Sequence, residues 1–427
     1  MRPQSFNIRF SLGVFAILAL AMTLAPAAEA TNGYFTHGYG TIAKALGGAG
    51  VAMPQDTLAA GTNPAGLAFL GKRYDIGVSV FGPNRSYTVE GNPSGFPGTF
   101  GLAPGKVESE STSFFIPQFG ANWLLNEANT LGIVIYGHGG MNTDYPTNTF
   151  GAQSPTGVNL EQLFVGVPWA FKYNEQHAFS IMPVFVYQSF EAQGVGSFAP
   201  FSSAPTKLSN NGANTTTGYG AKIGYMGNWF EKFSFGASYQ TEMKMGEFDD
   251  YAGLFAEQGG FNIPSTWTAG IAIKPTPKWA VLMDLQKIYY SDVKSINNPL
   301  LPNLQTARLG DDNGAGFGWK DMDVVKFGLQ YNTLDKWIWR AGLSIGAQPI
   351  PASEVLFNIL APGVMEEHLT FGFTRKIGTT MGLDFALMYA PEVEVSGPNS
   401  LEFPGAQQII LAMDQWEISL NYSWGIK

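Results

Sequence analysis

The sequence predicts an all-β protein: a 14-stranded antiparallel transmembrane β-barrel with an N-terminal plug, or hatch, in its lumen. Three observations predict it: linkers that alternate in length, a period-two pattern of apolar residues, and tryptophans beside the short linkers. The strand-like segments are residues 73–89, 108–123, 129–141, 160–173, 177–193, 217–228, 231–247, 264–274, 278–290, 322–332, 336–349, 366–377, 380–395 and 409–425.

The linkers between these segments alternate between short and long. Only residues 124–128 separate the second segment from the third, and only residues 174–176 separate the fourth from the fifth. Residues 142–159 and 194–216, in contrast, are long connections. Strands that cross a bilayer turn alternately on its two sides, and outer-membrane barrels carry short turns on one side and long loops on the other.

A period of two runs through the predicted strands. Between Phe233 and Gln240, apolar or aromatic residues at odd positions alternate with small or polar residues, and between Trp416 and Trp424 the apolar residues hold the even positions. Consecutive side chains of a strand point to opposite faces, so each strand has one apolar and one polar face. In a membrane barrel the apolar face meets lipid and the polar face lines the lumen.

The tryptophans separate a membrane barrel from a soluble β-sandwich, which shares the period of two. Trp123, Trp229, Trp279 and Trp337 each stand beside a short linker. Tryptophan favours the membrane interface, where its ring lies in the apolar zone and its N–H among the headgroups. A sandwich buries its apolar faces and needs no such girdle, so the pattern favours the barrel.

Residues 1–30 are predicted to be a secretory signal peptide. Arg2 and Arg9 give it a positive start, residues 12–24 are apolar, and residues 28–30 read Ala-Glu-Ala, a small-residue cleavage site. The apolar run is too short to span a bilayer, which argues against the alternative of a membrane anchor. Export of a barrel predicts the outer membrane of a Gram-negative bacterium.

The composition excludes several classes of protein. Charged residues make up only 13% of the chain and the formal net charge is −9, so no nucleic-acid partner is expected. Without cysteine the chain forms neither disulfides nor cysteine-based metal sites. The four histidines lack the spacing of metal ligands, so we expect no metal and no cofactor. We also expect no enzyme, because we recognise no catalytic constellation.

Residues 31–72 differ from the strands. Nine glycines punctuate short apolar pieces there, and the segment is too apolar for a disordered tail. It precedes the first strand, and a wide barrel needs either a water channel or a plug. The predicted organisation is therefore a signal peptide at 1–30, a hatch at 31–72 and a barrel at 73–427.

Two motifs in the predicted hatch point to a family. Residues 47–50 read Gly-Gly-Ala-Gly, and residues 62–67 read Thr-Asn-Pro-Ala-Gly-Leu. Placed before fourteen strands, they resemble motifs of the FadL/TodX family of outer-membrane transporters for long-chain fatty acids and hydrocarbons. The resemblance covers essentially the whole mature chain, and it implies that Asn63, Pro64 and Ala65 form the hatch motif.

The third predicted strand carries three glycines in four residues: Gly137, His138, Gly139 and Gly140. Glycine weakens strand pairing and permits unusual backbone dihedral angles. The resemblance implies that these residues form an inward kink that opens the barrel wall sideways, with His138 in place of the family's usual bulky residue. An ordinary β-bulge at the barrel rim is the alternative.

The long loops are unusually apolar for segments that face water, which suggests a groove for an apolar ligand. A lid of mutually packed loops is the alternative. The candidate ligand-binding residues are Phe198, Phe201, Leu254, Phe255, Phe261, Val355, Leu356, Phe357 and Leu360. Cations in the same loops could meet a carboxylate or the phosphates of lipopolysaccharide, or be solvated. They are Lys106, Lys207, Lys294 and Arg308.

The resemblance implies passive transport of hydrophobic small molecules, by capture in the external loops, a pocket above the hatch and lateral exit. A hydrophobic molecule gains about 0.8 kcal/mol per buried CH2, so a water-filled pore would disfavour its passage. The alternatives are a general diffusion porin and an outer-membrane enzyme that modifies lipids. The expected partners are a hydrophobic small-molecule substrate, outer-membrane lipid and lipopolysaccharide, and we expect a monomer.

Overall fold

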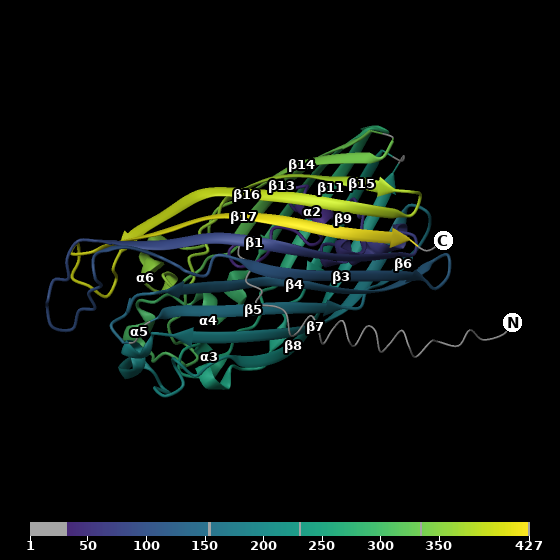
Figure 1. The fold of residues 1–427 in the computed structure, drawn as a ribbon. Coiled ribbons are helices and arrows are strands. Elements are labelled where there is room, and N and C mark those ends of the chain that lie inside the picture. Colours follow the sequence, from purple (N-terminus) through teal and green to yellow (C-terminus); the bar gives the residue numbers. More distant parts are fainter. Residues whose placement is uncertain (1–31, 153–154, 230–231, 334, 426–427) are drawn as a thin grey trace.

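The barrel is one closed antiparallel sheet (Figure 1). Its first strand, β1 (Arg73–Glu90), pairs with its last, β17 (Gln408–Gly425), along the whole length of both. Closure removes the two free outer edges that an open sheet would expose to the hydrocarbon of a membrane. The computed structural model describes residues 32–152, 155–229, 232–333 and 335–425. The predicted signal peptide lies outside the described residues.

Seventeen hydrogen-bonded segments make up fourteen strands, because β2 and β3, β5 and β6, and β9 and β10 are each two parts of one strand. The predicted fold class is confirmed. The remaining segments are β2 (Gly105–Glu108), β3 (Phe114–Leu124), β4 (Asn129–Tyr145), β5 (Thr156–Gly166), β6 (Trp169–Lys172), β7 (His177–Gln193), β8 (Asn214–Trp229), β9 (Phe233–Gln240), β10 (Lys244–Met245), β11 (Thr266–Thr276), β12 (Trp279–Ile288), β13 (Met322–Asn332), β14 (Trp337–Gly346), β15 (Glu367–Ile377) and β16 (Met381–Pro398).

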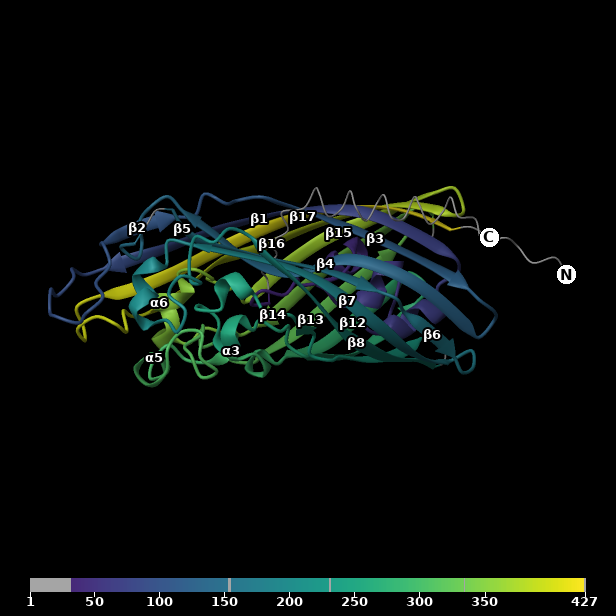
Figure 2. The same ribbon diagram turned by 90° about the horizontal axis from the view of Figure 1, so that it is seen from below.

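The two ends of the barrel differ as the linkers predict. The short turns gather at the end where the C-terminus lies, which we call the turn end (Figures 1 and 2). The long loops gather at the opposite loop end and contain short helices. These are η3 (Gly196–Phe201), η4 (Asp249–Tyr251), α3 (Ala256–Gly259), η5 (Tyr290–Asp292), α4 (Lys294–Asn297), α5 (Asn303–Thr306), η6 (Ala352–Glu354) and α6 (Val355–Asn358).

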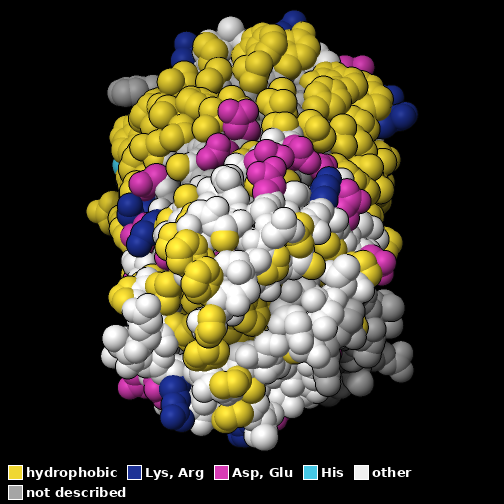
Figure 3. Space-filling model, turned by 90° about the vertical axis from the view of Figure 1, so that its left-hand side faces the viewer, with side chains coloured by type: hydrophobic (Ala, Val, Ile, Leu, Met, Phe, Trp, Pro, Cys, Tyr) yellow, Lys and Arg dark blue, Asp and Glu magenta, His cyan; other side chains and the backbone are white. Residues whose placement is uncertain are grey.

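The outer wall is apolar. In β12, Trp279, Val281, Met283 and Leu285 are exposed, whereas the residues between them are buried. Hydrophobic side chains form a broad belt on the wall, and a row of acidic side chains separates this belt from the loop face (Figure 3). Within the described ranges, no helix is both long and apolar enough to cross a membrane.

Residues 32–72, the hatch segment, lie inside the ring of strands (Figures 1 and 2). The segment contains α2 (Thr41–Lys44), η1 (Thr57–Gly61) and η2 (Pro64–Phe69). Side chains that accept from backbone N–H groups start the last two turns: Asp56 caps η1 and Asn63 caps η2, with Pro64 at its first position. Most of its side chains are buried, so the hatch segment fills the lumen near the turn end.

Candidate functional site

The lumen changes in character along its length, as β17 illustrates. Near the turn end its inward side chains are polar and bind the hatch segment or its surroundings: Glu417 pairs with Lys44, and Ser419 lies 2.6 Å from the Thr41 hydroxyl. Toward the loop end the inward positions of β17 become Met413, Leu411 and Ile409, which are buried in the main apolar cluster. The barrel therefore holds an apolar upper chamber above a polar lower layer.

Buried carboxylates of the wall hold the backbone of the hatch segment. Asp284 of β12 accepts hydrogen bonds from the N–H groups of Gly50 and Val51 at 2.7 and 2.9 Å. Asp75 of β1 accepts from both the N–H and the hydroxyl of Thr57, at 2.9 and 2.7 Å. Charge-assisted hydrogen bonds of this kind are stronger than neutral ones, so the hatch segment is tied to opposite parts of the wall.

Buried cations of the wall bind the same segment. Lys222 of β8 donates to the carbonyl of Gly61, and Lys326 of β13 donates to the carbonyl of His37 at 2.9 Å. Arg340 of β14 donates to the side chain of Gln55 at 2.9 Å. The polar faces predicted from the period of two thus serve the hatch segment rather than an open water column.

Asn63 of the predicted hatch motif connects three parts of the chain. Its amide donates to the carbonyls of Val51 at 2.8 Å and Tyr225 at 2.9 Å, and its oxygen accepts from the N–H of Ala65 at 3.1 Å. Gly224 of β8 leaves room for it, because a Cβ there would lie 2.2 Å from the Asn63 oxygen. The motif therefore joins two turns of the hatch segment to the barrel wall.

The glycine-rich stretch of β4 contains a β-bulge. Its pairing with β5 shifts register between Gly137 and Gly139, so His138 is an extra residue. The start of the hatch segment pairs with β4 at this level: the Thr36 N–H donates to the His138 carbonyl and the Gly140 N–H to the Tyr34 carbonyl, both at 3.0 Å. The bulge and the N-terminal segment thus form one unit.

His138 is fully buried and points into the lumen. Its Nδ1 lies 2.7 Å from the hydroxyl of Tyr39. Its ring stacks on Phe164 with centroids 4.0 Å apart and meets Phe35 edge-on at 4.3 Å. Aromatic contacts of this geometry favour a single packing arrangement, so the extra residue of the bulge is locked between the wall and the hatch segment.

Next to the bulge, β3 and β4 stop pairing. Their ladder runs only from Leu124–Thr130 to Phe119–Ile135. Toward the loop end, Phe114–Gln118 and Tyr136–Tyr145 share no ladder, until the Glu110 N–H donates to the Asp144 carbonyl at 2.8 Å. We call this break the unpaired segment. It lies at the level where residues 34–36 hydrogen-bond to β4.

The apolar loop residues form a packed cluster above the chamber. Five of the nine predicted ligand contacts line one cavity, which leaves about 20 Å³ of free volume, room for about one water. They are Phe198, Leu254, Phe255, Phe357 and Leu360. Phe261, Val355 and Leu356 are buried elsewhere in the cluster, and Phe201 is 46% exposed and does not join it. The loops therefore pack as a lid over a nearly filled cavity.

The lid is attached to β4. The Tyr145 hydroxyl donates to the carbonyl of Ile359 at 2.9 Å, and the Thr143 hydroxyl donates to the carbonyl of Leu360 at 2.8 Å. Both acceptors follow α6 directly. Two hydrogen bonds therefore join the α6 loop to the part of β4 that belongs to the unpaired segment.

The predicted carboxylate partners do not converge. Lys106 pairs with Glu108 at 3.0 Å, and Lys294 pairs with Glu257 at 2.9 Å, which raises the pKa of Lys294 through that hydrogen bond. Lys207 and Arg308 are exposed. Arg85, a buried residue of β1 whose side chain faces the lumen, is not among the predicted site residues. Its odd number is the signal in the sequence, because the lumen-facing residues of β1 have odd numbers.

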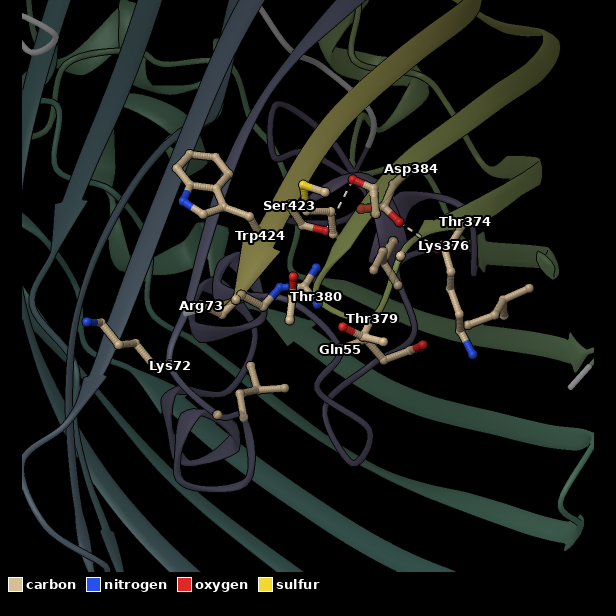
Figure 4. A pocket seen from close by; sticks show the side chains of 18 of the residues that line it. Gln55, Lys72, Arg73, Thr374, Lys376, Thr379, Thr380, Asp384, Ser423 and Trp424 are labelled. Atoms are coloured by element: carbon tan, nitrogen blue, oxygen red, sulfur yellow. Dashed lines mark hydrogen bonds between the residues drawn. The ribbon is translucent and has the colours of Figure 1, made fainter. Parts of the chain in front are cut away.

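A larger cavity of about 820 Å³ opens at the turn end, under the hatch segment (Figure 4). Gln55 contributes to it from the hatch segment, and Arg73, Thr374, Asp384 and Trp424 contribute from the wall. The Thr374 hydroxyl donates to Asp384 at 2.5 Å. This cavity lies on the far side of the hatch segment from the lid.

One stretch of β14 carries a sequence pattern found in serine enzymes. Residues 342–346 read Gly-Leu-Ser-Ile-Gly, the pattern of a serine nucleophile motif, contrary to the expectation that the sequence carries no catalytic pattern. That motif needs a strand-to-helix turn, whereas Ser344 lies within β14 and is fully buried. Among the described residues, no group of three or more histidine, aspartate or glutamate side chains could hold a metal ion.

Solved structures share this fold. The P. putida toluene transporter TodX aligns with 91% of this chain and 99% of its own, at a TM-score of 0.67 and 18% identity. A Pseudomonas aeruginosa FadL homologue aligns with 92% of this chain and 100% of its own, at a TM-score of 0.68 and 14% identity. The Ralstonia pickettii toluene transporter TbuX aligns with 92% of this chain and 99% of its own, at a TM-score of 0.64 and 17% identity. No curated protein matches the chain.

The sequence of the chain also matches a protein family. The family described as "Outer membrane protein transport protein (OMPP1/FadL/TodX)" matches residues 18–401, most of the chain. This match confirms the resemblance that the hatch motifs predict, and with it the outer-membrane location. The chain belongs to the OMPP1/FadL/TodX family of outer-membrane transport proteins.

Proposed function

We propose that this protein is a passive channel for hydrophobic small molecules, which enter between the external loops, occupy the upper chamber and leave sideways between β3 and β4. The observation that carries the proposal is the coincidence of three features at one level of the wall. There the β3–β4 ladder ends, the bulge at His138 bends β4, and residues 34–36 hydrogen-bond to its free edge.

The physical argument for a lateral route is the cost of the alternative. Below the chamber the lumen is filled by the hatch segment and by buried charges such as Lys44, Glu417 and Asp284. A hydrophobic molecule that passed them would lose about 0.8 kcal/mol per CH2 of favourable burial and would disturb charged hydrogen bonds. Sideways exit leads from an apolar chamber into an apolar membrane.

Capture at the lid begins this route. The cavity beneath the loops leaves about 20 Å³, so a ligand enters only by displacing side chains such as Phe198 and Phe357. Tyr145 and Thr143 connect the α6 loop to β4, so this displacement acts on the strand beside the exit. Binding and opening are thereby coupled through two hydrogen bonds.

Deletion of His138 tests the lateral route. The deletion removes the extra residue opposite β5 and allows β4 to pair regularly, so we expect uptake of radiolabelled oleate and toluene to stop in a host that lacks its own transporter. The variant His138→Ala keeps the extra residue, and we expect it to keep uptake. If the deletion variant folds and transports at the native rate, the lateral route is wrong. A path through the hatch segment into the 820 Å³ cavity would then be the better mechanism.

A further inference from the structure

The short turns on one side of the barrel carry a cluster of cations at the turn end. These cations belong to the β8–β9, β11–β12, β13–β14 and β15–β16 connections and to the strand ends beside them. Among the described residues of these turns, Asp335 is the only acidic one. Five of the six cations are exposed, and Lys376 is half-buried. We call the cluster the basic rim: Lys232, Lys274, Lys278, Lys336, Arg375 and Lys376.

Hydrogen bonds between neighbouring strands hold like charges side by side in the basic rim. The Lys274 N–H donates to the Lys232 carbonyl, and the Lys376 N–H donates to the Lys336 carbonyl, both at 2.7 Å. None of these four side chains forms an ion pair with another described residue. Like charges on adjacent strands repel each other and destabilise a sheet, and an anionic partner from outside the chain would relieve that repulsion.

Tryptophans place the basic rim at the border of the apolar belt. Trp279 directly follows Lys278 and is 40% exposed, and Trp337 directly follows Lys336. The Cζ of Arg375 lies 5.3 Å from the ring centroid of Trp337. Tryptophan favours the membrane interface, and long cationic side chains reach from there to the headgroups. This level in the membrane favours a lipid over a soluble protein as the anionic partner.

The two borders of the apolar belt differ in charge. A row of acidic side chains separates the belt from the loop face (Figure 3), whereas the basic rim lies at the turn end. In an outer-membrane barrel the short turns face the periplasm. The basic rim therefore meets the headgroups of the periplasmic leaflet.

The basic rim also lies away from the proposed exit. In the order of the closed sheet its turns are centred on β12 and β13, opposite the break between β3 and β4. The β3–β4 turn, residues 124–128, holds Glu127 and neither lysine nor arginine. Beside the β6–β7 turn, Lys172 pairs with Glu175 at 3.2 Å. The described turns nearest the exit therefore present no unpaired cation.

We propose that the basic rim binds the anionic headgroups of phospholipids in the periplasmic leaflet. Clustered lysines attract an anionic membrane surface, and ammonium groups pair with phosphate oxygens through charge-assisted hydrogen bonds. Anionic lipids are thereby held on the side of the barrel opposite the exit, so the ring of lipid around the wall is uneven in charge. The inference goes beyond the proposed function and does not rest on the route of the substrate.

Binding of two matched lipids tests the inference. The intact barrel in a neutral detergent is titrated with dioleoyl phosphatidylglycerol, which is anionic, and with dioleoyl phosphatidylcholine, which carries no net charge. Native mass spectrometry counts the bound lipids. We expect the unmodified protein to bind phosphatidylglycerol more tightly than phosphatidylcholine. Lys336→Gln should weaken phosphatidylglycerol binding about fivefold, the effect of one lysine near an anionic surface, and change phosphatidylcholine binding less than about twofold.

Two further variants complete the comparison. The combined variant Lys274→Gln and Lys336→Gln removes one lysine from each adjacent pair, so we expect a loss of about tenfold or more for phosphatidylglycerol. Lys172→Gln is the matched control, because Lys172 lies at the same end of the barrel but already has Glu175 as its partner. It should bind both lipids as the unmodified protein does. Each variant is first required to show the heat-dependent gel mobility of the folded barrel.

An acidic peptide distinguishes a lipid from a soluble partner. Binding of a fluorescein-labelled peptide of twelve glutamates is followed by anisotropy. If the peptide binds and the combined variant loses the peptide but keeps phosphatidylglycerol, the basic rim is a docking site for an acidic protein and the lipid inference is wrong. Equal binding of both lipids by the unmodified protein overturns the inference as well. Uptake in the His138 deletion variant reports on the lateral route separately, so either idea can fail while the other stands.

Discussion

At the scale of single residues, Gly139 shows why a residue type alone can mislead. Its place in a glycine-rich strand suggests that it supplies an unusual backbone dihedral angle. Its φ, however, does not lie in the left-handed region. A Cβ at this position would lie 2.1 Å from the carbonyl oxygen of Tyr34, so glycine is needed because the N-terminal segment approaches β4 closely. The close approach of Tyr34, and not a left-handed φ, accounts for glycine at this position.

Asn63 gives a prediction at the same scale. Asn63→Ala removes three hydrogen bonds and leaves the buried carbonyl of Val51 without this donor, so we expect the hatch segment to lose about 2–4 kcal/mol of local stability. Hydrogen exchange followed by mass spectrometry should show faster exchange in peptides of residues 50–67. Asn63→Asp keeps the acceptor for Ala65 but loses both donors, and should exchange faster than the unmodified protein too.

The control for Asn63 is Asn313→Ala, an exposed loop residue of the same type. It should leave the exchange of residues 50–67 unchanged. If Asn63→Ala exchanges at the native rate, the motif serves something other than the attachment of the hatch segment to β8.

At the scale of elements, the strands were predictable because their signals are local. Apolar alternation and short turns depend on neighbours in sequence, and β7 and β13 begin and end at the residues that these signals indicate. The unpaired segment was not predictable. Residues 108–113 read as the start of a strand, but β3 begins only at Phe114, and its ladder with β4 begins only at Phe119. At that level residues 34–36, which lie far from β4 in the sequence, hydrogen-bond to it.

The residues of the candidate site were also predictable only in part. Loop hydrophobicity located Phe198, Phe255 and Phe357, because a buried cluster requires apolar residues wherever it forms. It could not show that Phe201, in the same loop, faces solvent. Arg85 has the residue type and the inward position of an ordinary lumen residue, and only the structure shows that it is buried and that its Nε has no hydrogen-bond partner.

The hatch segment gives the prediction for an element. It fills the lumen and is held by Asp75, Asp284, Lys222 and Lys326, so we expect the intact protein to show little steady ion conductance in planar bilayers. Deletion of residues 32–72 should open a large conductance, since the charged wall would then face water. A large steady current through the intact protein would contradict this and favour a general diffusion porin.

At the scale of the whole molecule, the closed sheet predicts how the protein behaves in solution. We expect mainly β-type circular dichroism in detergent, and a gel mobility that changes on boiling, because every strand is paired on both sides over much of its length. We also expect a monomer by light scattering. A helical spectrum, or a protein that stays dispersed without detergent, would contradict the barrel.

The seam between β1 and β17 has a consequence for assembly. These two strands share eighteen register pairs, although they are the first and last strands of the barrel in sequence. The seam closes only after every other strand has been made, and contacts so distant in sequence form late. The hatch segment precedes β1 and hydrogen-bonds to several strands of the wall, so we expect it to lie between the strands before the seam closes. During biogenesis, protection of the hatch segment from added protease should therefore appear together with protection of the seam, and never after it.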